Sequence, residues 1–467
     1  MANPHIPHSG RRSNNPCSGH FLFLPLFLIV PLLFISVVPA SAEDAMFRAN
    51  PEHTGVYDIG GVEPGNTELW RFATGDGVYS SPAVANGIVY VGSEDKNLYA
   101  VDAVTGKEKW RFTTGDHVFT SPTVAEGIVY VGSEDKNLYA IDIATGKERW
   151  RFAMGGWVYS SPAVVNGIVY AGNSYESLYD LKDTNGSLYA IDAVTGKERW
   201  RFPMGGIADR SPVVANGIVY LGSGDENLYA IDAATGKEKW RTAKGDWVYS
   251  SPAVADGIVY VGNEDKRLYA IDAVTGEEKW RFATGDRVVS SPAVVNGIVY
   301  VGSWDKNLYA IDAVTGKEKW RFTTGDKVDS SPAVANGIVY VGSGDKNLYA
   351  IDAMTGKEKW RFATGDRVDS SPAVANGIVY VGSEDKNLYA VGTNSVFLTI
   401  VPTTIPPTNI TPPWTSLQQT IASTPITSPA GGQNSGLAGA LPVLVIIGTI
   451  MLLAGGGYIL YRLKNKP

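Results

Sequence analysis

The side chains that most often carry catalysis or bind metal ions are scarce in this chain of 467 residues, or they recur in identical surroundings. Cys17 is the single cysteine, so the chain can form neither an internal disulfide nor a cysteine-based zinc site. Three of the five histidines fall within the first 20 residues, which argues against a histidine metal cluster.

The aspartates repeat at equivalent positions and are interpreted as structural. One turn of the repeat carries Asp95, Asp135, Asp305, Asp345 and Asp385, and another carries Asp102, Asp142, Asp192 and Asp232. A catalytic base must differ in environment from its counterparts in the other copies. We therefore expect no catalytic residue and no metal site.

Ligand binding is the chemistry that the variable residues of the repeat favour. One connection changes from copy to copy, with aromatic residues in the earlier copies and charged residues in the later ones. This mixture is typical of binding surfaces, although neutral drift of exposed loops is the alternative for any single residue. The candidate ligand-binding residues are Tyr79, His117, Phe119, Trp157, Tyr159, Trp247, Tyr249, Arg287, Trp304, Lys327 and Arg367, and the same connections carry Ile207, Asp209, Arg210, Asp329 and Asp369.

A unit of about 40 residues must position these side chains. Its tryptophan returns every 40 residues from Trp70 to Trp360, except for one spacing of 50 between Trp150 and Trp200. Turn signals at 86–87, 94–97 and 105–107 divide the first unit. They leave four strands, near 81–85, 88–92, 98–102 and 108–113, and four antiparallel strands per unit indicate a propeller blade.

The ring is expected to close through its N-terminal strand. Ser-Pro pairs from Pro82 to Pro372 count eight first strands, but the eighth unit lacks its outer strand. A spare copy of that strand stands at 68–72, and its pairing with blade eight would remove an open sheet edge. The sequence therefore predicts an all-β, eight-bladed β-propeller of four-stranded antiparallel blades over residues 67–394, after a lead-in over 43–66.

The variable residues should gather on one face of this propeller. The connection into the next blade and the loop between strands two and three share a face, and the opposite face repeats Asn-Gly and Thr-Gly-Lys turns. The variable face would be aromatic on one arc and charged on the other. The long insertion within Ser174 to Asn185 should project from this face.

The end of each unit resembles the tryptophan-docking motif of the pyrroloquinoline quinone (PQQ) repeat propellers. In the first copy it reads Tyr99-Ala100-Val101-Asp102-Ala103-Val104-Thr105-Gly106-Lys107-Glu108-Lys109-Trp110, and six later copies follow. The resemblance implies that each outer-strand tryptophan packs against the Ala and Gly of a neighbouring motif. Gly106 has no Cβ to block the approach of an indole. The tryptophans predicted to fasten blade to blade are Trp70, Trp110, Trp150, Trp200, Trp240, Trp280, Trp320 and Trp360.

The resemblance implies two kinds of function. The family includes dehydrogenases that hold PQQ over the ring with a calcium ion, near two adjacent cysteines and a catalytic aspartate; adjacent cysteines are absent here. It also includes a lipoprotein subunit of the outer-membrane β-barrel assembly machinery, whose propeller is a protein-binding scaffold. We expect a non-catalytic binding or assembly scaffold without a cofactor, and a PQQ-dependent dehydrogenase is the alternative.

The net charge of −7 argues against a nucleic-acid partner. We therefore expect an envelope protein or a glycan as the partner, and a monomeric chain.

The N-terminus predicts export. An apolar run over 21–38 follows Arg11 and Arg12 and ends at Ala40-Ser41-Ala42, which is typical of a signal peptide over residues 1–42. The run is also long enough to span a membrane, so an uncleaved anchor is the alternative.

The C-terminus predicts a membrane anchor. Residues 437–461 carry no charge and are long enough for a transmembrane helix, and residues 462–467 form a basic tail expected in the cytoplasm. The Pro/Thr/Ser-rich segment 395–436 should act as a stalk. We expect a single-pass protein of the cell membrane with the propeller outside. Asn185 and Asn409 lie in glycosylation sequons, which also arise by chance.

Overall fold

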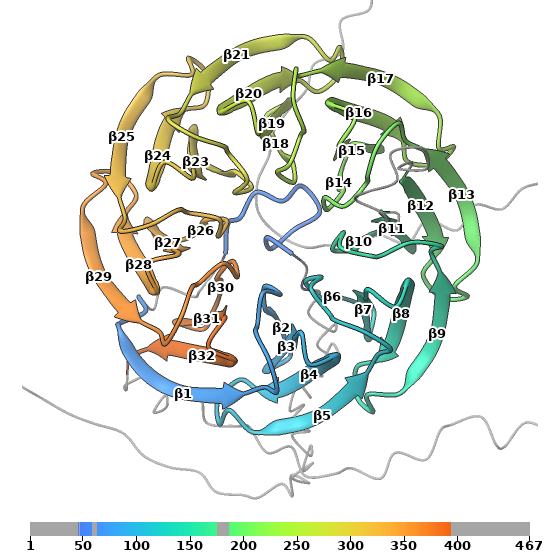
Figure 1. The fold of residues 1–467 in the computed structure, drawn as a ribbon, viewed down its shortest axis with the longest axis vertical. Helices are drawn as coiled ribbons and strands as arrows, with labels where there is room; N and C mark the ends of the chain where they lie inside the picture. Colours follow the sequence, from blue (N-terminus) through green and yellow to red (C-terminus); the bar gives the residue numbers. More distant parts are fainter. Residues whose placement is uncertain (1–44, 46, 58–62, 175–185, 394–467) are drawn as a thin grey trace, which may run out of the picture. The chain divides into compact units, whose positions relative to one another are not determined.

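Four-stranded antiparallel sheets stand as blades around a central axis (Figure 1). The structure is a computed structural model, and it describes residues 45, 47–57, 63–174 and 186–393. Eight such sheets occur within these residues, so the predicted all-β, eight-bladed propeller of four-stranded blades is confirmed. The predicted signal segment over 1–42, the stalk, the transmembrane helix and the basic tail all lie outside the described residues.

The blades follow the order of the chain from the inner to the outer strand. Blades one to four contain β2 (Ala83–Ala85), β3 (Ile88–Gly92), β4 (Asn97–Asp102) and β5 (Glu108–Thr113); β6 (Thr123–Ala125), β7 (Ile128–Gly132), β8 (Asn137–Asp142) and β9 (Glu148–Ala153); β10 (Ala163–Val165), β11 (Ile168–Gly172), β12 (Ser187–Asp192) and β13 (Glu198–Pro203); and β14 (Val213–Ala215), β15 (Ile218–Gly222), β16 (Asn227–Asp232) and β17 (Glu238–Ala243). Blades five to eight contain β18 (Ala253–Ala255), β19 (Ile258–Asn263), β20 (Arg267–Asp272) and β21 (Glu278–Ala283); β22 (Ala293–Val295), β23 (Ile298–Gly302), β24 (Asn307–Asp312) and β25 (Glu318–Thr323); β26 (Ala333–Ala335), β27 (Ile338–Gly342), β28 (Asn347–Asp352) and β29 (Glu358–Ala363); and β30 (Ala373–Ala375), β31 (Ile378–Ser383), β32 (Asn387–Gly392) and β1 (Thr67–Ala73).

The inner strand is shorter than the sequence predicts. In blade one it begins at Ala83 and not near Ser81, because Pro82 cannot donate to a ladder and the Ser81 amide bonds to the neighbouring blade.

Short polar motifs form the turns between the strands. Asn86 and Gly87 both have positive φ, as a two-residue hairpin requires. The Asp95 carboxylate accepts the Asn97 amide at 3.0 Å, and the Asp102 carboxylate accepts the Thr105 amide at 2.9 Å. These two aspartates thus form turns in the way the sequence predicts.

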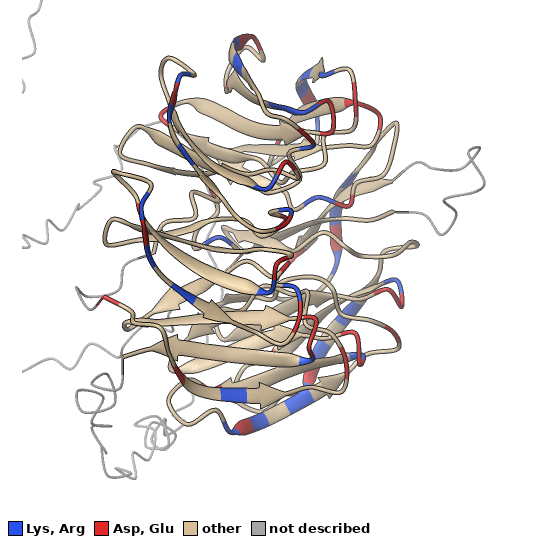
Figure 2. Cartoon of the chain, turned by 60° about the vertical axis from the view of Figure 1, so that its left-hand side comes forward, with Lys and Arg blue, Asp and Glu red and all other residues tan. Residues whose placement is uncertain are grey.

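Alternate residues of the three inner strands pack against opposite neighbouring blades. In β23, Val299 belongs to the core between blades five and six, and Tyr300 belongs to the core between blades six and seven. Charged residues are concentrated on the outer strands and turns (Figure 2), where Arg111 and Glu108 pair at 2.6 Å. The apolar core is therefore a series of layers between blades.

An indole hydrogen bond fastens each blade to the next. The Trp110 Nε1 donates to the Ile143 carbonyl at 3.0 Å, and a Cβ on Gly146 would lie 2.7 Å from the same indole. Blade eight has no docking motif, and there Trp360 Nε1 donates to the Pro64 carbonyl at 3.0 Å. The donors in chain order are Trp70, Trp110, Trp150, Trp200, Trp240, Trp280, Trp320 and Trp360. The first seven pack against the Gly of the next motif, as the resemblance implies, whereas Trp360 does not.

The N-terminal strand completes blade eight, as predicted. Strand β1 pairs antiparallel with β32, from Thr67 opposite Gly392 to Ala73 opposite Asn387. Trp70 then donates to the Ala103 carbonyl of blade one at 3.0 Å, which joins the two ends of the ring.

Residues 47–57 occupy the centre of the ring, an arrangement that the predicted lead-in over 43–66 did not include (Figure 1). Carbonyls of this segment accept amides from the inner strands of blades four to seven. The bonds join Val214 to Pro51 (2.9 Å), Val254 to Glu52 (2.9 Å), Val294 to Thr54 (2.8 Å) and Val334 to Gly55 (2.7 Å). We call residues 47–57 the plug.

A buried arginine holds the plug in place. The guanidinium of Arg48 donates to the carbonyls of Ser291 and Pro292, and to the plug's own His53 carbonyl at 3.1 Å. Burial, followed by the charge of Arg48, lowers the pKa of His53 to about 3, opposed in part by the backbone of Pro252. His53 is therefore neutral near pH 7, and Arg48 is the single charge of this pair.

Deletion of Thr67 to Thr74 should open the ring. The deletion removes the outer strand of blade eight and the docked Trp70, so we expect the melting temperature to fall by about 10 °C or more. Thermal unfolding followed by circular dichroism checks this. An unchanged melting temperature would contradict closure through β1.

Replacement of Arg48 by Met should destabilise the plugged ring by about 2 kcal/mol, because three carbonyls lose a charged donor. Arg71→Met is the matched control, because Arg71 is exposed and its ion pair with Glu68 contributes little. Denaturant unfolding of both variants measures the difference. Equal stability of the two would mean that Arg48 does not anchor the plug.

Candidate binding site

Two sets of equivalent residues surround the axis on the variable face. Each connection ends in a serine that every copy of the repeat shares, Ser81 in the first copy. The inner set stands two residues before this serine, and the outer set stands four residues before it. The inner set is Tyr79, Phe119, Tyr159, Asp209, Tyr249, Val289, Asp329 and Asp369, and the outer set is Gly77, His117, Trp157, Ile207, Trp247, Arg287, Lys327 and Arg367.

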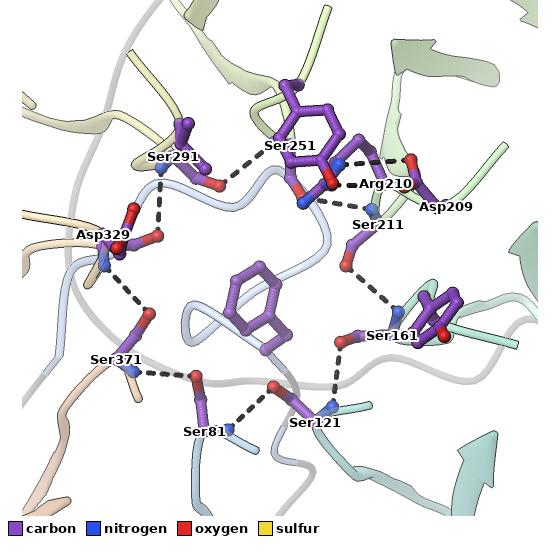
Figure 3. Close-up of a pocket in the computed structure, with 15 residues that line it drawn as sticks. Ser81, Ser121, Ser161, Asp209, Arg210, Ser211, Ser251, Ser291, Asp329 and Ser371 are labelled. Carbon is purple, nitrogen blue, oxygen red and sulfur yellow. Dashed lines mark hydrogen bonds and ion pairs between the residues drawn. The ribbon is translucent and has the colours of Figure 1, made fainter. Parts of the chain in front are cut away.

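A closed ring of serine hydrogen bonds supports the inner set. Each serine amide donates to the hydroxyl of the equivalent serine in the next blade, over 2.9 to 3.1 Å (Figure 3). The last bond runs from the Ser371 amide to the Ser81 hydroxyl and closes the circle. The eight serines are Ser81, Ser121, Ser161, Ser211, Ser251, Ser291, Ser331 and Ser371. The connections that carry the variable residues are thereby anchored to a rigid circle.

The variable residues surround a depression of about 560 Å³. Beneath it, Phe47 of the plug and the ring serines line a smaller cavity of about 160 Å³. The residues that line the depression are Tyr79, Phe119, Trp157, Tyr159, Ser174, Ile207, Asp209, Arg210, Trp247, Tyr249, Val289, Trp304, Lys327, Asp329 and Asp369. Phe47 of the plug thus lies on the axis of the ring, below the depression.

Aromatic rings in mutual contact form one arc of the depression. The ring of Phe119 lies 5.6 Å from Tyr79 and 5.8 Å from Tyr159, measured between centroids. Trp157 contacts Tyr159 at 6.0 Å, and Trp247 stacks with Tyr249 at 6.3 Å. The Trp247 side chain is the most open of these anchors, since 40% of the residue is exposed.

Charged residues form the other arc, around Asp329 and Asp369, and one charged pair, Arg210 with Asp209, interrupts the aromatic arc between Tyr159 and Tyr249. The Arg210 guanidinium lies 3.3 Å from the centre of the Tyr249 ring and pairs with Asp209 at 3.2 Å. The ammonium of Lys327 pairs with Asp329 at 2.5 Å and lies 4.8 Å from the Trp304 ring. The indole N–H of Trp304 donates to the same Asp329 carboxylate.

Asp369 is the carboxylate of this arc without a bonded cation among the described residues. Its Oδ1 is buried and makes no hydrogen bond. Burial, followed by the charge of Asp329, raises the pKa of Asp369 to about 7. Asp369 therefore titrates near neutral pH.

Eight of the eleven sequence-predicted candidates line the depression, and three do not. His117 contacts Phe119 at 5.6 Å, and Arg287 lies over the Trp304 ring at 5.3 Å, so both stand beside it. Arg367 occupies the equivalent outer position before blade eight. Asn185, most of the insertion and Asn409 lie outside the described residues, but the Ser174 amide bonds to the Trp157 carbonyl at 2.9 Å, which places the start of the insertion at this face.

Sequence reasoning missed the serine ring, Val289 and Phe47. The identity of the second serine in all eight copies was a signal for the ring, because the residue before it varies. No comparable signal marked Phe47, since it lies outside the repeat.

Within the described residues, one group could hold a metal ion through Asp116, His117 and Glu134. The Nδ1 of His117 lies 3.0 Å from the Glu134 carboxylate, and Lys96 pairs with Asp116 at 3.0 Å. These pairings account for the cluster without an ion.

Comparison with known proteins places this ring in a family. The family model described as outer membrane protein assembly factor BamB matches residues 58–188, 184–321 and 304–395. No curated protein gives a significant sequence match.

Three solved structures illustrate the likeness of fold. A computationally designed protein, Ika8, has a TM-score of 0.63 at 19% identity, over 70% of this chain and 100% of its own. BamB from Moraxella catarrhalis has a TM-score of 0.59 at 18% identity, over 70% and 98%. The quinohemoprotein alcohol dehydrogenase from Comamonas testosteroni has a TM-score of 0.64 at 17% identity, over 74% and 80%. At these identities the likeness concerns the fold.

Replacement of Asp369 by Asn should stabilise the protein at pH 8 and have little effect at pH 4. The folded state binds the Asp369 proton more tightly than the unfolded state, so the stability that this proton contributes is present below pH 4 and lost as pH rises through about 7. We expect a gain of about 2 °C in melting temperature at pH 8. Thermal scans across this pH range test it, and a loss of stability at pH 8 would contradict the assignment.

Proposed function

The chain belongs to the family of the outer membrane protein assembly factor BamB, and from this membership we propose that it is a non-catalytic scaffold that binds a partner in the depression of its variable face. One observation carries the proposal: seven aromatic side chains from four connections and one loop converge on a single depression. Aromatic anchors in a partly desolvated hollow are typical of the energetic centre of an interface.

The partner is an envelope protein or a glycan. Both present surfaces that stack on aromatic rings, and the paired charges around the depression add directional contacts at its rim. We propose a monomeric propeller, since β1 pairs with β32 and blade eight has four strands like the other blades.

The proposal places the propeller outside the cell membrane. Its support is the sequence alone, through the signal segment 1–42, the stalk 395–436, the apolar segment 437–461 and the basic tail 462–467. Among the described residues, the structure contains no helix that is long and apolar enough to cross a membrane.

The alternative is a PQQ-dependent dehydrogenase, and the residues of the depression fit it poorly. PQQ carries three carboxylates, whereas Arg210 and Lys327 are already paired with Asp209 and Asp329. Calcium requires six to eight converging oxygen ligands, and the carboxylates Asp209, Asp329 and Asp369 come from connections into three different blades. We derive no reaction through either group.

Substitution of Trp157 and Trp247 together by Ala should weaken partner capture by roughly thirtyfold or more, because truncation of an interface anchor costs about 2 kcal/mol or more. The full chain in detergent, immobilised, is used to capture the partner from solubilised envelope. The fold should remain intact, since both residues lie on connections.

The matched control is Val274→Ala with Val314→Ala, which truncates exposed apolar residues in the turns of the opposite face. This control should capture normally. Trp240→Ala should instead damage the fold. Normal capture by the Trp157/Trp247 variant together with loss in the Val274/Val314 variant would place the site on the opposite face.

A further inference from the structure

The charges that line the depression are unevenly compensated. Arg210 neutralises Asp209, and Lys327 neutralises Asp329, each by a direct ion pair. Asp369 has no such cation: its carboxyl is hydrogen-bonded to that of Glu384, and its Oδ1 is buried without a hydrogen bond. An ionised carboxylate in this position loses solvation without a paired cation to compensate for it, which is costly.

The groups that face Asp369 do not remove this imbalance. Asp329 and Glu384 are both acidic and disfavour its ionised form, and Lys327, which favours it, is already bonded to Asp329. Tyr79 lies on the connection that follows blade eight, and burial, followed by the charges of Glu384 and Asp369, raises the pKa of its hydroxyl. It therefore supplies no positive charge to Asp369. Arg367 projects from the outer position of the same connection, where its charge acts on Lys327. The local field is therefore negative at the Asp369 carboxylate.

The walls at this end of the depression are aromatic. Tyr79 and Trp304 line it together with Asp369, and the Trp304 ring already has two cations against it, Lys327 at 4.8 Å and Arg287 at 5.3 Å. Aromatic faces attract organic cations through their quadrupole, and they contact alkyl chains well. A hydrated metal ion gains little from such walls, since it needs several oxygen ligands.

We propose that the Asp369 end of the depression binds a basic side chain, the alkylammonium of a lysine or the alkylguanidinium of an arginine, from the partner protein. The proposal rests on the binding function proposed above and commits it to a protein partner. The cation would lie against the Asp369 carboxylate, and its alkyl chain against Trp304 and Tyr79. The depression is larger than a single side chain and leaves room for the segment that carries it.

The test uses three small probes with the full chain in detergent: Nα-acetyl-lysine N-methylamide, Nα-acetyl-norleucine N-methylamide and Nα-acetyl-glutamate N-methylamide. The lysine probe keeps its free ammonium group. Ligand-observed saturation-transfer NMR measures binding. At pH 8 the lysine probe should bind at least about tenfold more tightly than the other two. Its affinity should fall at least about tenfold by pH 5, where Asp369 is protonated.

Asp369→Asn should lower the affinity for the lysine probe at least about tenfold at pH 8. The matched control is Asp366→Asn, which removes an exposed aspartate from the same connection and should leave the affinity within about twofold. Equal binding of the norleucine probe, or an Asp369→Asn variant that binds the lysine probe unchanged, would overturn the proposal.

Partner capture in the same preparations separates this proposal from the broader one. If the lysine probe fails to bind while the Trp157/Trp247 variant still loses capture, the cation site is wrong and the scaffold function stands. If the probe binds through Asp369 while that variant captures normally, the cation site is supported and the proposed interface is wrong.

Discussion

The docking of an indole from each blade onto the backbone of the next is the interaction on which the rest of the molecule depends. A blade is a narrow sheet that cannot bury both of its faces alone, and its apolar layers form only between neighbours. The Trp110 bond to Ile143 and the missing Cβ at Gly146 fix the distance and angle at which those layers meet. Pro64 takes the place of the docking motif that blade eight lacks, so the same contact is made around the whole circle.

Once the blades are fixed, the centre of the ring becomes a rigid platform. The serine circle joins the inner ends of all eight blades through the same hydrogen bond, and the plug binds the inner strands of blades four to seven. The connections above the circle are then free to vary, because their variable side chains contribute little to these bonds. Asp369 is one product of this variation. Its Oδ1 is buried without a hydrogen bond, which lowers the stability of the folded state when the carboxylate is ionised.

The fold could be predicted from the sequence because the same turn and strand signals recur from copy to copy of the repeat. The Asn86-Gly87 turn, the Gly106 turn and the spare strand at 68–72 each determine one step of the chain path, and the structure agrees with all three. The convergence of Trp157, Trp247 and Trp304 on one depression also followed from their places in the unit. The plug could not be predicted, because residues 47–57 have no period and bind through backbone carbonyls, which any sequence offers. The ion pairs of Arg210 and Lys327 depend on side-chain directions that spacing does not define.

The most direct test of the account is photo-crosslinking in intact cells, with a photoreactive amino acid in place of Trp247 in one strain and of Val274 in another. Both residues are exposed and lie on opposite faces of the ring, so the two strains differ only in the face that is probed. The account predicts a discrete adduct with one partner protein from position 247 and none from position 274. An adduct from position 274 alone would contradict the claim that the variable face is the binding face.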